Sequence, residues 1–73
     1  MKDALERLKR RYGLKIPTKV IMADYDADEG DLYIKFSEAE HTEGEPSNDG
    51  LVIVHYDSSD AIAAIEILNL ADL

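Results

Sequence analysis

Three aspartates at alternate positions, Asp24, Asp26 and Asp28, have the spacing that most resembles a cation site in this sequence. The calcium loop of an EF-hand begins in this way, but it also needs glycine at its sixth position and glutamate at its twelfth. Here Glu29 holds the sixth position and Lys35 the twelfth, so the pattern is incomplete. We interpret the aspartates as turn residues whose carboxylates accept backbone hydrogen bonds, and we expect neither a metal nor a cofactor.

The remaining residues with catalytic potential are two histidines, His41 and His55. The chain has no cysteine, and it contains no zinc-protease, nucleophile-elbow or phosphate-loop motif. We therefore expect a protein that is not an enzyme, with no catalytic residues. The alternative is a small hydrolase or metal-dependent enzyme whose site forms across a dimer from His55, Glu66 and turn aspartates.

A basic cluster near the N-terminus has the side chains that grip phosphates: Arg7, Lys9, Arg10, Arg11 and Lys15. The chain as a whole carries a formal net charge of -8, and these cations belong to no nucleic-acid recognition motif with regularly interleaved aromatic residues. Cations at this place also favour the negative end of a helix dipole. Nucleic acid is therefore a disfavoured partner.

Charge is divided unevenly along the chain. Residues 1–19 hold seven basic and two acidic side chains, whereas residues 20–73 hold one basic and fourteen acidic side chains. In such a chain the two halves can pair with each other or with a second copy, or the acidic half can face a basic protein. The alternative is that the charge serves only to keep the protein soluble. We expect an acidic interaction protein with a basic protein partner.

Length and hydropathy place the chain among small domains without a membrane anchor. Its 73 residues allow one domain. The longest apolar runs, residues 51–54 and 61–65, are far shorter than the ~20 residues that cross a bilayer. The absence of cysteine and of an apolar leader fits a cytoplasmic protein with no membrane partner.

The N-terminal residues 1–13 have the pattern of an amphipathic helix. Ala4, Leu5, Leu8 and Tyr12 form one apolar stripe at helical spacing, and Gly13 is placed to cap the end.

Beyond this helix the apolar period changes to two, which predicts strands near residues 19–25, 31–37, 51–57 and 61–68. Residues 38–49 are acidic and almost without apolar side chains, which predicts a loop outside the core. The fold class is therefore α+β: one domain over residues 1–73, with a helix followed by a four-stranded, mostly antiparallel β-meander spanning residues 19–68.

The last strand is open to a second interpretation, because Ser58, Ser59 and Asp60 are suitable caps for a helix. A weak internal repeat favours the strand. Shifting the sequence by 31 residues places residues 25–26 on 56–57, both Tyr-Asp, and aligns the apolar positions of two similar hairpins.

The first and third predicted strands are apolar on both sides, and one helix covers only one face of a sheet. We therefore expect a homodimer that buries the second face. The candidate interface residues are Ile53, Val54, Tyr56, Ile65, Ile67, Leu8 and Tyr12.

Four blocks of sequence resemble a short prokaryotic family, domain-of-unknown-function family 2283. They are residues 25–26, 30–36, 50–57 and 65–68, and the resemblance covers about residues 19–70. It implies a compact β-meander with a strand at 61–68. It implies no activity. Members of the family resemble small acidic proteins encoded beside small toxin-like proteins, which is the arrangement expected of an antitoxin.

Overall fold

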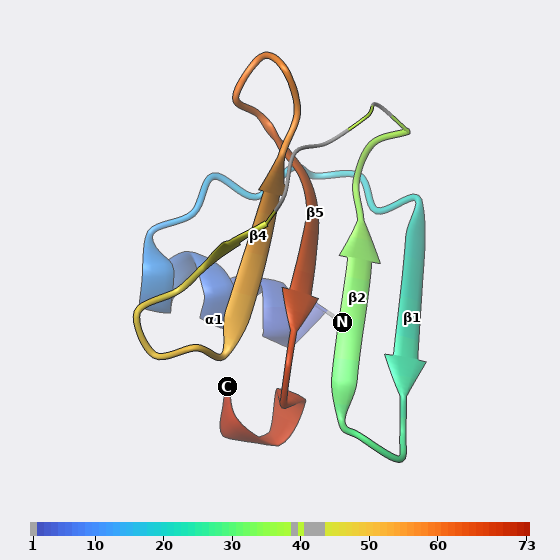
Figure 1. The fold of residues 1–73 in the computed structure, drawn as a ribbon, viewed down its shortest axis with the longest axis vertical. Coiled ribbons are helices and arrows are strands. Elements are labelled where there is room, and N and C mark those ends of the chain that lie inside the picture. The colour runs from blue at the N-terminus through green and yellow to red at the C-terminus, as the bar shows by residue number, and fades with distance from the viewer. Residues whose placement is uncertain (1, 39, 41–43) are drawn as a thin grey trace.

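One helix packs against a single antiparallel sheet in the computed structural model, which describes residues 2–38, 40 and 44–73 (Figure 1). The elements in chain order are α1 (Lys2–Tyr12), β1 (Met22–Asp26), β2 (Asp31–Lys35), β3 (Glu45–Pro46), β4 (Val52–Tyr56), β5 (Ile62–Ile67) and the 3₁₀ helix η1 (Leu70–Asp72). The α+β class is as predicted, with five strands in place of four.

Helix α1 follows the apolar stripe read from the sequence. Leu8 is fully buried, and Leu5 and Tyr12 pack against the core beside it. The helix ends at Gly13, which has a left-handed φ of 65° and donates its N–H to the Lys9 carbonyl at 3.0 Å. The predicted cap is therefore confirmed, because a residue with a Cβ is strained at this φ.

The order of the strands differs from a meander. A meander would place the strand at 52–56 beside β2, but the observed order is β1-β2-β5-β4-β3. β5, at residues 62–67, is the strand expected at 61–68, and it occupies the centre of the sheet between β2 and β4. The predicted meander is thus wrong, because alternating apolar residues specify a buried face but not which strand lies alongside.

The two hairpins are related by an approximate two-fold axis, as the 31-residue repeat implies. Ile34 and Ile65, which are 31 positions apart, lie opposite each other in the β2–β5 ladder. Ala23 pairs with Ile34 in the first hairpin, and Val54 pairs with Ile65 in the second, again 31 positions apart. The repeat therefore describes matching strand registers as well as matching residue types.

The core lies between α1 and one face of the sheet. Seven buried strand residues belong to this core: Leu32, Ile34, Val52, Val54, Ile62, Ile65 and Ile67. The opposite, open face carries Tyr33, Lys35, Ile53, His55 and Glu66, a mixture of apolar and polar side chains. This mixture of side chains is typical of an antiparallel sheet with one face packed on the core and the other turned to solvent.

Strand β1 is exposed along its whole length. In Figure 1 the helix begins near β2 and crosses behind β5 and β4, and β1 lies beyond its N-terminal end. The described part of a single chain therefore buries neither face of this strand, although the sequence is apolar on both. The strand also begins at Met22, three residues later than predicted, after the Ile21 N–H has bonded to the Lys35 carbonyl at 2.9 Å.

The segment expected as a loop, residues 38–49, contains β3, which pairs with β4. Gly44 precedes β3 and lies so close to β4 that an added Cβ would overlap the Ile53 side chain and approach His55 Cε1 to 2.9 Å. This part of the segment therefore packs directly on the sheet, and position 44 requires glycine because its backbone lies against the Ile53 side chain.

Residues 69–73 turn back under the sheet. Asn69 caps η1 by accepting the Ala71 N–H, and Leu70 and Leu73 pack against the core. Within the described residues no helix has the length and apolar character needed to cross a membrane.

Candidate functional site

The two edges of the sheet offer very different surfaces. β3 forms one edge with only two residues, one of them Pro46, which has no N–H to donate. β1 forms the other edge with five residues and a single neighbour, β2. Alternate residues of an edge strand turn their N–H and C=O groups away from the sheet, so β1 presents a row of backbone groups to solvent.

Apolar side chains are exposed mainly at this same edge. The described residues include four large hydrophobic side chains that are exposed, and three of them are Ile21 (38%), Met22 (44%) and Tyr25 (54%). Tyr25 pairs with Leu32 and Ala23 pairs with Ile34, so both point to the helix-side face. Because α1 does not extend over β1, this part of the apolar face is open.

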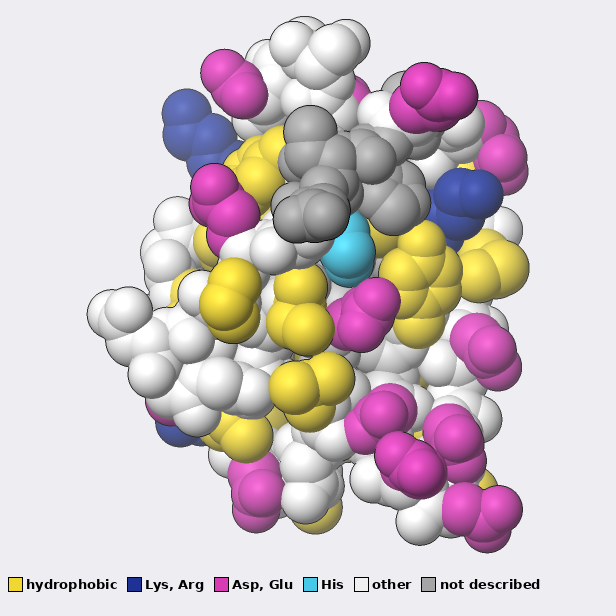
Figure 2. All heavy atoms as spheres, viewed as in Figure 1, with side chains coloured by type: hydrophobic (Ala, Val, Ile, Leu, Met, Phe, Trp, Pro, Cys, Tyr) yellow, Lys and Arg dark blue, Asp and Glu magenta, His cyan; other side chains and the backbone are white. Residues whose placement is uncertain are grey.

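Acidic side chains surround the exposed apolar group. Asp24 and Asp26 are exposed on β1, Asp28 and Glu29 are exposed in the following turn, and Asp31 begins β2. In Figure 2 acidic side chains gather at the lower right, over the end of the sheet where Figure 1 places the β1–β2 turn. We define the β1 edge surface as Ile21, Met22, Ala23, Asp24, Tyr25 and Asp26.

Of the three aspartates interpreted as turn residues, Asp26 serves the backbone of its turn, whereas Asp24 lies in the middle of β1 and is not a turn residue. The Asp26 carboxylate accepts the N–H groups of Asp28 at 3.0 Å and Glu29 at 3.3 Å. Asp57, at the equivalent place in the second hairpin, accepts the N–H groups of Ser59 at 2.8 Å and Ala61 at 3.1 Å. These bonds lower the pKa of Asp57, the Ser59 hydroxyl bond being the largest cause.

Among the described residues, no group of three or more His, Cys, Asp and Glu side chains is arranged to hold a metal ion.

His55 and Glu66, the pair named in the enzymatic alternative, do lie together on the open face. His55 Nε2 is 3.3 Å from Glu66 Oε1, with the two side chains 13% and 40% exposed. The turn aspartates Asp26 and Asp57 lie at the ends of the hairpins, with their carboxylates bonded to their own turns. The other candidate, His41, lies outside the described residues.

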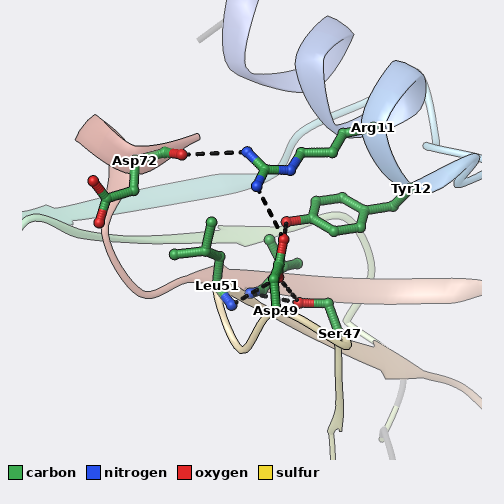
Figure 3. Close-up of polar contacts among 7 residues, drawn as sticks. Arg11, Tyr12, Ser47, Asp49, Leu51 and Asp72 are labelled. Carbon is green, nitrogen blue, oxygen red and sulfur yellow. Dashed lines mark hydrogen bonds and ion pairs between the residues drawn. The ribbon is translucent and has the colours of Figure 1, made fainter.

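A polar cluster that sequence reasoning did not find joins helix, turn and C-terminus (Figure 3). Asp49 accepts hydrogen bonds from the Tyr12 hydroxyl at 2.7 Å, the Ser47 hydroxyl at 2.6 Å and the Leu51 N–H at 3.1 Å. It also lies 3.1 Å from the Arg11 guanidinium, which donates to the Asp72 carbonyl at 3.2 Å. Ser47 and Asp49 flank the turn before β4, which is the local signal that a turn-closing aspartate was present.

The bonds to Asp49 favour its charged form. Its pKa falls from 3.8 to about 2, through the Ser47 hydroxyl first, then the Leu51 N–H and the Tyr12 hydroxyl. Burial raises the pKa of Tyr12, and donation to Asp49 raises it further. The cluster is therefore a structural tie that depends on an ionised aspartate and a protonated tyrosine.

The basic residues of the N-terminal cluster are used in part by the chain itself. Arg11 pairs with Asp49, and Lys9 lies 3.9 Å from Glu6 within the helix. Arg7 and Arg10 are exposed and line a shallow depression with Arg11 and Leu73. Lys15 is exposed in the connection to the sheet.

The expected dimer interface residues divide between core and surface. Four of them, Leu8, Val54, Ile65 and Ile67, are buried in the core of one chain, so they are unavailable to a second copy. Tyr12 and Tyr56 pack against this core and are partly buried. Only Ile53 belongs to the open face, and Gly44 packs over it. Sequence reasoning missed the β1 edge surface, because it assigned the exposed apolar residues of β1 to a buried strand.

No protein family, curated protein or solved structure matches this chain at a significant level. The resemblance to family 2283 stays an expectation that rests on the four sequence blocks alone.

Proposed function

We propose that this chain is a non-enzymatic interaction domain that binds a basic protein through the β1 edge surface. The observation that carries the proposal is the concentration of Ile21, Met22 and Tyr25 at one sheet edge, where most of the exposed large apolar side chains of the described residues gather. Apolar side chains grouped on a small soluble domain mark a surface that a partner covers.

Charge supports a basic partner over other classes. The acids Asp24, Asp26, Asp28 and Glu29 lie on or beside this surface, and the chain as a whole carries -8. An acidic surface attracts cationic partners and accelerates their association, and it repels nucleic acid and anionic lipid.

The enzymatic alternative has less support from the geometry. It requires turn aspartates beside His55, but Asp26 and Asp57 direct their carboxylates to backbone N–H groups of their own turns. The His55–Glu66 pair alone has the form of a cross-strand polar contact on a solvated sheet face.

The test is to recover partners of the full chain from cells that express it and to compare two charge reversals. Asp24→Lys alters the β1 edge surface, and Glu45→Lys makes the same charge change on exposed β3 at the far edge. We expect a basic protein to bind the unmodified chain and Glu45→Lys, and to bind Asp24→Lys at least about tenfold more weakly, since repulsion replaces attraction. Equal binding to both variants would refute the proposal.

A further inference from the structure

We propose that β1 binds its partner as a sixth strand, in which basic residues alternate with apolar ones. This deepens the proposed function and rests on it. An extended segment that joins a sheet edge gains backbone hydrogen bonds, and its side chains then alternate between the two faces of the sheet.

The two faces beside β1 set the chemistry of that alternation. On the open face Asp24 pairs with Tyr33 and Asp26 pairs with Asp31, so an incoming strand meets carboxylates there. Lys35 lies on the same face opposite Met22, and it forms an ion pair with Glu38 at 3.2 Å. The acidic region is therefore at the turn end of β1, and basic residues of the partner belong beside Asp24 and Asp26.

The helix-side face selects apolar residues. Ala23 and Tyr25 point to this face, and each lies beside a buried residue of β2, Ile34 and Leu32. Because α1 begins near β2 and does not reach over β1, apolar side chains of an added strand would extend the core beyond β2 and cover Tyr25. A strand with every second residue apolar and the others Lys or Arg satisfies both faces at once.

Asp24 is the carboxylate of the β1 edge surface that is best placed to form an ion pair with a partner's Lys or Arg. Asp26 is hydrogen-bonded within its turn, whereas no Lys or Arg of the described residues forms an ion pair with Asp24, which is exposed in the middle of the strand.

A second copy of this chain fits the edge less well than a basic segment. Pairing β1 with β1 would place the Asp24 and Asp26 carboxylates of two copies beside each other, and like charges in that position are destabilising. Pairing β1 with β3 of another copy would use a two-residue strand containing Pro46.

The experiment measures the binding of an eight-residue peptide of alternating Lys and Val to the intact chain. A peptide of the same composition with the four lysines first and the four valines last is the control for charge alone. Two further peptides carry backbone N-methyl groups, one on each set of alternate residues. In an added strand only one set of N–H groups faces β1, so we expect N-methylation of that set to weaken binding by about tenfold or more through lost hydrogen bonds. N-methylation of the other set should change binding by less than about twofold.

A second measurement locates the added strand. Exchange of β1 backbone amides with deuterium should slow on alternate residues of β1 when the alternating peptide binds, and Asp24→Lys should abolish the slowing while Glu45→Lys retains it. The proposal is overturned if the alternating peptide fails to bind, or if it binds no more tightly than the control peptide with four lysines followed by four valines. It is also overturned if neither N-methylated peptide binds more weakly than the unmethylated one. A basic partner from cells that still discriminates Asp24→Lys from Glu45→Lys would then leave the proposed function standing without the added strand.

Discussion

The Tyr12 hydroxyl donates a 2.7 Å hydrogen bond to Asp49, which joins the last turn of α1 to the turn before β4. The same carboxylate accepts hydrogen bonds from the Ser47 hydroxyl and the Leu51 N–H, and it forms an ion pair with Arg11 (Figure 3). The Asp49 side chain thus ties the end of α1 to the turn at residues 47–51, two parts of the chain that are far apart in sequence.

We expect Asp49→Asn to lower the free energy of unfolding in a pH-dependent way. The pKa of Asp49 is about 2 in the folded chain against an ordinary 3.8, so its stabilisation is complete above 3.8 and is lost as the pH falls toward 2. Urea midpoints should therefore show a gap between the unmodified chain and Asp49→Asn at neutral pH that closes in this acidic window.

The control for the Asp49 experiment is Tyr12→Phe, which removes one donor and leaves the charge. It should lower stability by about 0.5–1.5 kcal/mol. A gap for Asp49→Asn that is constant from neutral pH to pH 2 would contradict the argument.

Adjacent residues of β4 should respond oppositely to a charge. Val54 is 6% exposed in the core, and Ile53 is half-buried on the open face. We expect Val54→Asp to abolish the folded state, because a buried carboxylate without a partner costs several kcal/mol, about as much as a small domain has. Ile53→Asp should retain the circular dichroism spectrum and cooperative unfolding of the unmodified chain. Unfolding of both variants would show that the open face is also buried.

Gly44→Ala should destabilise the contact between β3 and β4. The new methyl group would overlap Ile53, so we expect a loss of about 1–3 kcal/mol, as overpacking usually costs. Shortening the obstructing side chain tests the cause, because Ile53→Ala in the same chain should recover part of the loss. A double-mutant cycle in urea measures the recovery. If the loss of unfolding free energy in the double variant equals the sum of the two single losses, the substitutions are independent and the overlap with Ile53 is not the cause.

Asp24→Val should make the chain more prone to self-association. A charged side chain in the middle of an edge strand discourages pairing between identical edges, and β1 otherwise has exposed Met22 and Tyr25 beside it. Sedimentation velocity should show a larger dimer fraction for Asp24→Val than for the unmodified chain at equal concentration. Glu45→Val at the opposite edge is the control and should leave the dimer fraction unchanged.

The local sequence pattern predicted the helices and strands correctly where the pattern fits only one type of secondary structure. The helical stripe ending at Gly13 specified α1, and the repeat decided for a strand at β5 over a capped helix. The turn role of Asp26 followed from its position between two alternating segments. The helix, the strand and the turn each depend on residues that are close together in the sequence, so one sequence is enough to predict them.

Strand order and exposure depend on partners distant in sequence, and there the predictions were wrong. The apolar residues of β1 are the same types as those of β4, but β1 lies beyond the reach of an eleven-residue helix. Glu45 and Pro46 have no strand pattern at all, and they form β3 because β4 offers its free edge. The tie at Asp49 joins it to Tyr12 and Arg11, which are 37 and 38 positions away in the sequence, and no local motif encodes such a contact.

The inequality of the two edges limits the size of any complex. Backbone pairing can proceed outward from β1, but Pro46 and the brevity of β3 block it on the other side. If a partner strand adds to β1 as proposed, each molecule would accept one strand, and the complex would close at a ratio of one to one. The domain would then bind an extended segment without starting the growth of a fibre.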